Sequence, residues 1–155
     1  VSTATWSFRF LRFYAGAVTR ARQSAHPVLT GPMTGCLLAR YRSGGSNYVA
    51  HIGTTDSHGQ QVNDDVKQNW RDWIARDKVS DVRARAPYYE VVTNLDMGPH
   101  YTLAGPPSVW GYFTNQEAYA LVISYHPGHM ARHQNRIEMV RPMALLPWAH
   151  YDAQW

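Results

Sequence analysis

The chain has 155 residues, of which 45% are hydrophobic and 17% are charged, a balance that excludes an intrinsically disordered protein. This length fits one globular domain over residues 1–155, with about two-thirds of the surface of the unfolded chain buried. The net charge of +4 comes from scattered arginines, and no apolar run approaches the ~20 residues of a membrane span, so neither a basic nucleic-acid arm nor a transmembrane helix is expected.

Three strands are predicted in the first third of the chain. Residues 5–14 alternate between aromatic and polar side chains, which is typical of a strand. Residues 35–42 and 47–53 predict two further strands, and Gly44 and Gly45 between them indicate a hairpin turn.

Residues 63–77 carry the one clear helical pattern. Apolar side chains recur there at i, i+4, i+7 and i+8, so they form one stripe along a helix, and an asparagine or aspartate can cap its start. The stripe consists of Val66, Trp70, Trp73 and Ile74. We expect it to pack against a sheet.

Beyond the helix the sequence is β-rich. The segments 96–107 and 127–134 carry Gly, Pro and His, and are predicted to be loops. The fold class predicted is α+β, a β-sandwich-like mixed sheet core with one clear amphipathic helix and a loop-rich C-terminal half. The strand-like segments are residues 88–94, 110–114, 119–126, a near-continuous apolar run, and 136–140.

The only cysteine of the chain, Cys36, lies six positions after Thr30 and fifteen before His51, near the facing ends of the predicted hairpin. A thiol acts as a nucleophile only when ionised, and His51 can supply the base. Thr30 can orient the imidazole or bind a substrate amide. Backbone amides at Thr34 and Gly35 can form an oxyanion hole or bind substrate. The alternative is that Cys36 is simply a small apolar residue in a buried strand.

The spacing of Thr30, Cys36 and His51 resembles the catalytic constellation of bacterial cysteine-dependent glutamine deamidases. This group includes the chemotaxis receptor deamidases, the catalytic domain of cytotoxic necrotizing factor and Burkholderia lethal factor. The likeness covers residues 28–53, where Met33-Thr34 stands in place of the Leu-Ser that typically precedes Gly-Cys. The resemblance implies that Cys36 is the nucleophile, His51 the base and Thr30 the third member of the site.

The same resemblance implies the activity and the setting. The reaction expected is hydrolysis of a glutamine side chain on the surface of a protein substrate, without a metal or organic cofactor. The protein would be a bacterial toxin or effector, in the bacterial cytoplasm or delivered into a target cell. A single cysteine, which cannot form an internal disulfide, fits a reducing compartment.

The histidines near the C-terminus offer a metal site as an alternative. His126, His129 and His133 would converge on a metal only if the segment after Gly128 were helical, and no cysteine or glutamate completes a known signature. We therefore expect solvated loop histidines and no metal. His100, in another predicted loop, is an alternative partner for the thiol.

Two other functional classes stay open. A protease or acyltransferase would use the same Cys36 and His51, with Asn47, Asp56 or Asn94 orienting the imidazole. A non-catalytic binding module would instead use an aromatic and arginine-rich face to bind protein or nucleic acid. The reactivity of the thiol distinguishes these classes.

Overall fold

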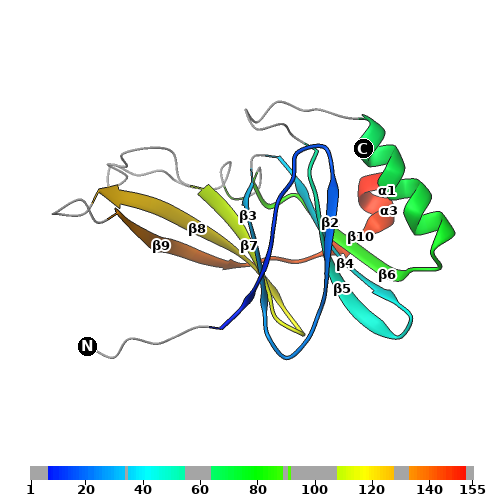
Figure 1. Cartoon of the computed structure of the whole chain (residues 1–155), viewed down its shortest axis with the longest axis horizontal. Helices are drawn as coiled ribbons and strands as arrows, with labels where there is room; N and C mark the ends of the chain where they lie inside the picture. The colour runs from blue at the N-terminus through cyan, green and yellow to red at the C-terminus, as the bar shows by residue number, and fades with distance from the viewer. Residues whose placement is uncertain are drawn as a thin grey trace.

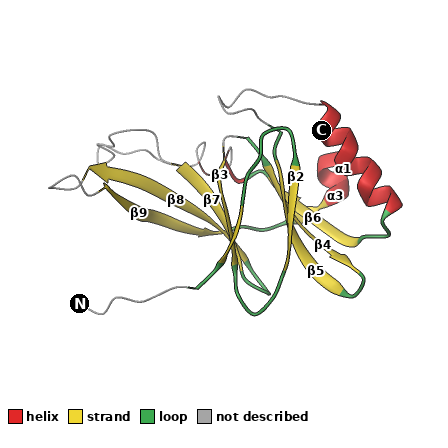
Figure 2. Cartoon of the chain, in the orientation of Figure 1, coloured by secondary structure: helices red, strands yellow, loops and turns green. Residues whose placement is uncertain are grey.

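The computed structural model describes residues 7–33, 35–54, 64–88, 91, 108–127 and 133–152. Within these ranges the chain forms two five-stranded sheets and two helices, α1 (Asp64–Arg76) and α3 (Trp148–Asp152). Both helices lie on the outer side of one sheet (Figure 1), and Figure 2 shows the succession of helices, that sheet and the other sheet. The predicted α+β fold with a sandwich-like core is confirmed.

The first sheet has the strand order β1-β3-β7-β8-β9. The pairing of β1 with β3 is parallel, and the other neighbours are antiparallel. Along β7, the side chains of Val109 and Phe113 are buried whereas the alternate residues are partly exposed, so one face of this sheet points into the core. The strands are β1 (Arg9–Leu11), β3 (Val28–Met33), β7 (Ser108–Phe113), β8 (Ala118–Pro127) and β9 (His133–Pro142).

The second sheet has the order β10-β6-β4-β5-β2 and is antiparallel throughout. Its β4–β5 pair is the predicted hairpin, with a continuous ladder from Leu37 and Ile52 down to the turn. Gly44 and Gly45 have φ of 54° and 77°, the left-handed region that a tight hairpin turn requires. The strands are β2 (Val18–Arg22), β4 (Leu37–Ser43), β5 (Ser46–Ile52), β6 (Ser80–Arg85) and β10 (Leu146–Pro147).

Alternate residues of β4 enter two different cores. Leu38 points toward the first sheet and belongs to a buried cluster with Phe113. Tyr41 points toward the helices and meets Trp70 of α1 edge-on, with ring centroids 6.0 Å apart. Trp70 is 1% exposed, so its truncation to alanine would cost about 3–5 kcal/mol. The second sheet is therefore covered by the first sheet on one face and by the helices on the other.

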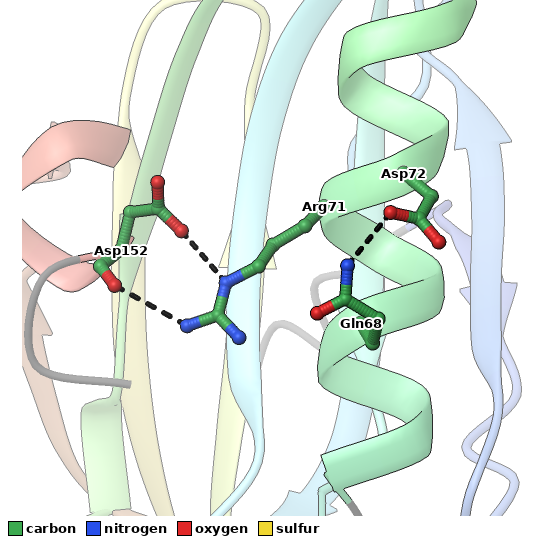
Figure 3. Close-up of polar contacts among 4 residues, drawn as sticks. All are labelled: Gln68, Arg71, Asp72 and Asp152. Atoms are coloured by element: carbon green, nitrogen blue, oxygen red, sulfur yellow. Dashed lines mark hydrogen bonds and ion pairs between the residues drawn. The ribbon is translucent and has the colours of Figure 1, made fainter.

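Polar contacts hold α1 against the C-terminal helix. Figure 3 shows Arg71 extending to Asp152, with Nε 2.8 Å from the carboxylate and Nη2 3.2 Å from the backbone carbonyl. Within α1, Gln68 donates a 2.7 Å hydrogen bond to Asp72. The ion pair is partly exposed, so it contributes at most about 1 kcal/mol. The helix predicted over residues 63–77 is confirmed.

A second link joins the two sheets through Arg40 of β4. Its guanidinium donates hydrogen bonds to three backbone carbonyls in the turn between β7 and β8, those of Thr114 (2.6 Å), Gln116 (3.0 Å) and Glu117 (3.0 Å). Burial lowers the pKa of Arg40 from its usual value of 12.5, but the group stays charged at neutral pH. One side chain of the second sheet therefore donates hydrogen bonds to three backbone carbonyls in a turn of the first sheet.

The outer face of the first sheet is covered by neither α1 nor α3. Four large apolar side chains are about half exposed there or beside it: Phe8, Phe10, Ile137 and Val140. Three of them, Phe8, Ile137 and Val140, line a groove of about 420 Å³ together with Leu29. An apolar face therefore lies open on the side of the molecule away from the helices.

The N-terminal strand prediction is wrong in extent. Of residues 5–14, the strand covers only β1, and the described chain beyond it turns back toward β2. Strands β2, β3, β6 and β10 were not predicted. Arginines at alternate positions leave few apolar residues in β2 and β6, Gly31 and Pro32 interrupt the apolar run of β3, and β10 has only two residues.

Two predictions in the C-terminal half are also corrected. In the stretch 127–134, which was predicted as a loop, Pro127 ends β8 and His133 begins β9, since the two strands pair as far as these residues. Residues 128–132 lie outside the described part of the chain. In the stretch 88–94, which was predicted as a strand, Tyr88 and Val91 are helical, and the other residues lie outside the described part. The strands predicted over 110–114, 119–126 and 136–140 are confirmed as parts of β7, β8 and β9.

Candidate functional site

The hairpin places His51 beside the strand that follows Cys36. Leu38 of β4 is paired with His51 of β5, and Leu37 with Ile52. Cys36 directly precedes β4 and is buried. The cysteine therefore lies two residues along the chain from the residue that is paired with His51.

Thr30 approaches the imidazole from the opposite sheet. Its hydroxyl oxygen lies 2.7 Å from Nδ1 of His51, and both side chains are buried. Thr30 lies on β3 between the half-buried Leu29 and the buried Gly31, and its own side chain is fully buried. The contact therefore crosses the interface between the sheets, and it joins two of the three residues that the sequence proposes for the site.

The imidazole is enclosed on all sides. His51 is 1% exposed, and its Nε2 has no hydrogen-bond partner within the described part of the chain. This burial lowers the pKa of His51 from 6.5 to about 3, so the ring is neutral at physiological pH. In the tautomer protonated at Nδ1, the ring donates to Thr30 and keeps an acceptor lone pair on Nε2.

A short segment between β1 and β2, residues 12–17, closes the site. We call it the Phe13 strap. The ring of Phe13 lies 5.0 Å from that of His51, centroid to centroid, at an interplanar angle of 34°. The strap is held at Gly53 by hydrogen bonds from the Gly16 amide to the Gly53 carbonyl (2.8 Å) and from the Gly53 amide to the Ala17 carbonyl (2.9 Å).

Gly53 is required for this close approach. A Cβ at this position would collide with the carbonyl oxygen of Tyr14 and would lie 3.0 Å from the ring of Phe13. Because only glycine leaves that space empty, the strap can lie directly on the end of β5. Cys36 is itself 0% exposed.

Thr54 is a residue of the site that the sequence analysis missed. Its hydroxyl donates a 2.9 Å buried hydrogen bond to the carbonyl of Gly35, the residue before the cysteine. Gly35 has a φ of 135°, a conformation that side-chain-bearing residues rarely adopt. The only available signal was a threonine directly after the glycine that ends a predicted strand, which is too common a pattern to indicate a function.

The remaining candidates are distant or lie outside the described residues. Asn47 is exposed beside the hairpin turn, at the opposite end of β5 from His51, so it does not orient the imidazole. The proposed residues outside the described ranges are Thr34, Asp56, Asn94, His100, with the predicted loop 96–107 around it, and His129.

Two of the three histidines proposed as metal ligands lie on strands, His126 on β8 and His133 on β9. His129 and the segment after Gly128, where convergence on a metal required a helix, lie outside the described residues. Across the residues described, no group of three or more His, Cys, Asp or Glu side chains is placed to hold a metal ion.

Comparisons with protein-family models, with characterised proteins and with solved structures find no match to this chain. In the described portion of the fold, no helix combines the length and the apolar character needed to cross a bilayer. The site thus consists of a neutral imidazole on the second sheet, a hydroxyl on the first sheet, and a buried thiol directly before β4.

Proposed function

We propose that the protein is a cysteine-dependent hydrolase that converts the side-chain amide of a glutamine in a protein substrate into a carboxylate. The observation that carries this proposal is the 2.7 Å contact between Thr30 and His51, whose strand β5 pairs with the strand that Cys36 directly precedes. A hydroxyl on Nδ1 fixes the orientation of the imidazole, and Nε2, which has no hydrogen-bond partner among the described residues, is left to accept the thiol proton once the thiol is brought within reach.

The reaction would proceed in two acyl-transfer steps. In the first, Nε2 of His51 accepts the thiol proton while Cys36 Sγ attacks the amide carbon, and backbone amides near Gly35 stabilise the oxyanion. His51 then protonates the nitrogen, the carbon–nitrogen bond breaks, and ammonia leaves a thioester behind. In the second step His51 activates a water molecule that hydrolyses the thioester, so that glutamate and the free thiol are formed.

Access to the buried thiol would require the Phe13 strap to move. Only two backbone hydrogen bonds hold it at Gly53, and its aromatic ring is the group that lies against His51. Displacement would also let water reach the imidazole, which raises its pKa from about 3 toward 6.5 and makes it a stronger base. The closed state would thus be the resting state and the opened state the reactive one.

The direct test is the release of ammonia from protein substrates, with peptide mass spectrometry to locate glutamines converted to glutamate. Bacterial and animal cell extracts serve as the substrate pool. We expect conversion by the unmodified protein and by Phe13→Ala, and none by Cys36→Ser or His51→Gln with unchanged circular dichroism. Conversion that persists in Cys36→Ser, or that is absent even in Phe13→Ala, would contradict the proposal.

The alternative of a binding module is favoured by one observation, the open apolar face of the first sheet around Ile137 and Val140. Such a module would keep its biological effect after Cys36→Ser and would lose it when charges replace these two side chains. The deamidase would show the reverse pattern. A protease would release new amino termini from the same extracts rather than ammonia.

A further inference from the structure

We propose that Thr54 is a positioning residue for the nucleophile, because it fixes the peptide that joins Gly35 to Cys36. This inference rests on the proposed function, in which Cys36 is the attacking group. Its basis is the buried 2.9 Å hydrogen bond from the Thr54 hydroxyl to the Gly35 carbonyl. Thr54 is itself 1% exposed, so water does not compete for this bond.

The Thr54 hydrogen bond acts on the chain just before the β4–β5 ladder. This ladder starts at Leu37 and Ile52, one residue after the cysteine. On its other side lies Gly35, with a φ of 135° and the wide conformational freedom of glycine. A peptide unit is rigid and planar, so anchoring its oxygen also sets the direction of the Cys36 amide and restricts the placement of the thiol-bearing carbon.

The anchor is itself part of the segment that carries the base. The amide of Thr54 donates to the carbonyl of Ile52 at 3.0 Å, and Gly53 between them is held by the Phe13 strap. Residues 51–54 therefore present the imidazole and the Thr54 hydroxyl from one constrained turn of chain. The hydroxyl couples the position of the nucleophile to that of His51.

The test compares Thr54→Val, which removes the hydroxyl and keeps the shape, with Thr54→Ser, which keeps the hydroxyl. Thr54→Ala is a second hydroxyl-free variant if valine impairs folding. Thr114→Val is the matched control, because Thr114 also donates to a backbone carbonyl, that of Glu117 at 3.3 Å, in the turn between β7 and β8. This turn follows Phe113, which pairs with Val28 at the end of β3 that is farther along the chain from Cys36. Two rates are measured for each variant: ammonia release, and alkylation of Cys36 by iodoacetamide at pH 7, in the native and Phe13→Ala backgrounds.

We expect Thr54→Val and Thr54→Ala to lower kcat and the alkylation rate on the order of tenfold to a hundredfold, with KM little changed, since small displacements of reacting groups have effects of this size. Thr54→Ser should restore both rates, and Thr114→Val should change neither. An unchanged or increased alkylation rate in folded Thr54→Val, or a loss of melting temperature without a loss of rate, would overturn the proposal.

The two proposals fail separately. If the unmodified protein and Phe13→Ala release no ammonia while the hydroxyl-free variants still slow alkylation, the deamidase function is wrong and the anchoring role of Thr54 stands. If ammonia release and alkylation are both unaffected by Thr54→Val, the anchoring role is wrong and the deamidase stands.

Discussion

The aromatic ring of Phe13 lies against the imidazole of His51, with centroids 5.0 Å apart, although the two residues belong to separate parts of the chain. This contact makes the strap the cover of the site. Replacing Phe13 by alanine removes the ring and should raise the rate of Cys36 alkylation by iodoacetamide at least about tenfold, because a buried thiol reacts only when it becomes exposed.

The control for this experiment lies in the same strap. Tyr14 is 53% exposed, so Tyr14→Ala removes an aromatic ring of similar size that does not cover the site. It should leave the alkylation rate near that of the unmodified protein. Equal rates for all three proteins would show that the strap is not what limits access.

The hydroxyl of Thr30 should matter for rate as well as for stability. Thr30→Val keeps the shape but leaves Nδ1 of His51 without its 2.7 Å partner. We expect kcat to fall on the order of tenfold to a hundredfold, because the imidazole loses its fixed orientation, and the free energy of unfolding to fall by about 1–3 kcal/mol. Thr30→Ser should recover most of both. Full activity in Thr30→Val would show that the Thr30 hydroxyl has no role in the reaction.

Gly53→Ala should displace the strap by a different route. Its methyl group would collide with the Tyr14 carbonyl, so the strap must shift or the variant loses about 1–3 kcal/mol of stability. Either response should increase Cys36 alkylation. Gly44→Ala is a suitable control, because its φ of 54° imposes backbone strain while no atom lies within 4 Å of the added methyl. Suppose that Gly44→Ala is less stable than the unmodified protein but that its Cys36 is alkylated at the same rate. The faster alkylation of Gly53→Ala would then result from displacement of the strap and not from lower overall stability.

The buried imidazole predicts a pH-dependent stability. The pKa of His51 is about 3 in the folded protein and near 6.5 in the unfolded chain, so between these values the unfolded chain binds a proton that the folded protein does not. The contribution of His51 is therefore complete above pH 6.5 and is lost as the pH falls toward 3, by at most about 1.4 kcal/mol per pH unit.

Denaturant unfolding of the native protein and of His51→Gln at several pH values isolates this contribution, because the other histidines are common to both. We expect the difference in unfolding free energy between the two proteins to shrink by about 1–2 kcal/mol between pH 7 and pH 5. A difference that stays constant over this range would mean that the imidazole is hydrated in the folded state.

Arg40 should be important for the docking of the two sheets. Arg40→Met removes three hydrogen bonds to the β7–β8 turn, and we expect it to lower the free energy of unfolding by about 3 kcal/mol. Arg83 offers the control, since it pairs with Asp81 on the surface at 3.0 Å with both side chains more than half exposed. Arg83→Met should cost less than about 1 kcal/mol.

Local patterns predicted those elements whose structure depends on neighbours in sequence. The α1 stripe and the Gly44-Gly45 hairpin are of this kind, and both were correctly predicted from the sequence. Strand β2 is different, because its sequence of alternating arginines becomes a strand by pairing with β5.

The residues of the site divide in the same way, into those that a local sequence pattern indicates and those that depend on contacts between distant segments. The spacing of Thr30, Cys36 and His51 was visible in the sequence, whereas the roles of Phe13 and Thr54 depend on contacts between segments that no local pattern connects. Gly53 likewise looked like the end of a strand, and only the approach of the strap gives it a specific reason to be glycine.

The contact between Thr30 and His51 ties chemistry to assembly. The imidazole belongs to the β4–β5 hairpin, whose contacts are local in sequence, but the hydroxyl that meets it comes from the other sheet. During refolding, the environment of His51 should therefore become native together with the docking of the sheets rather than with the hairpin. In the proposed enzyme, a working site would form only after the two sheets had docked.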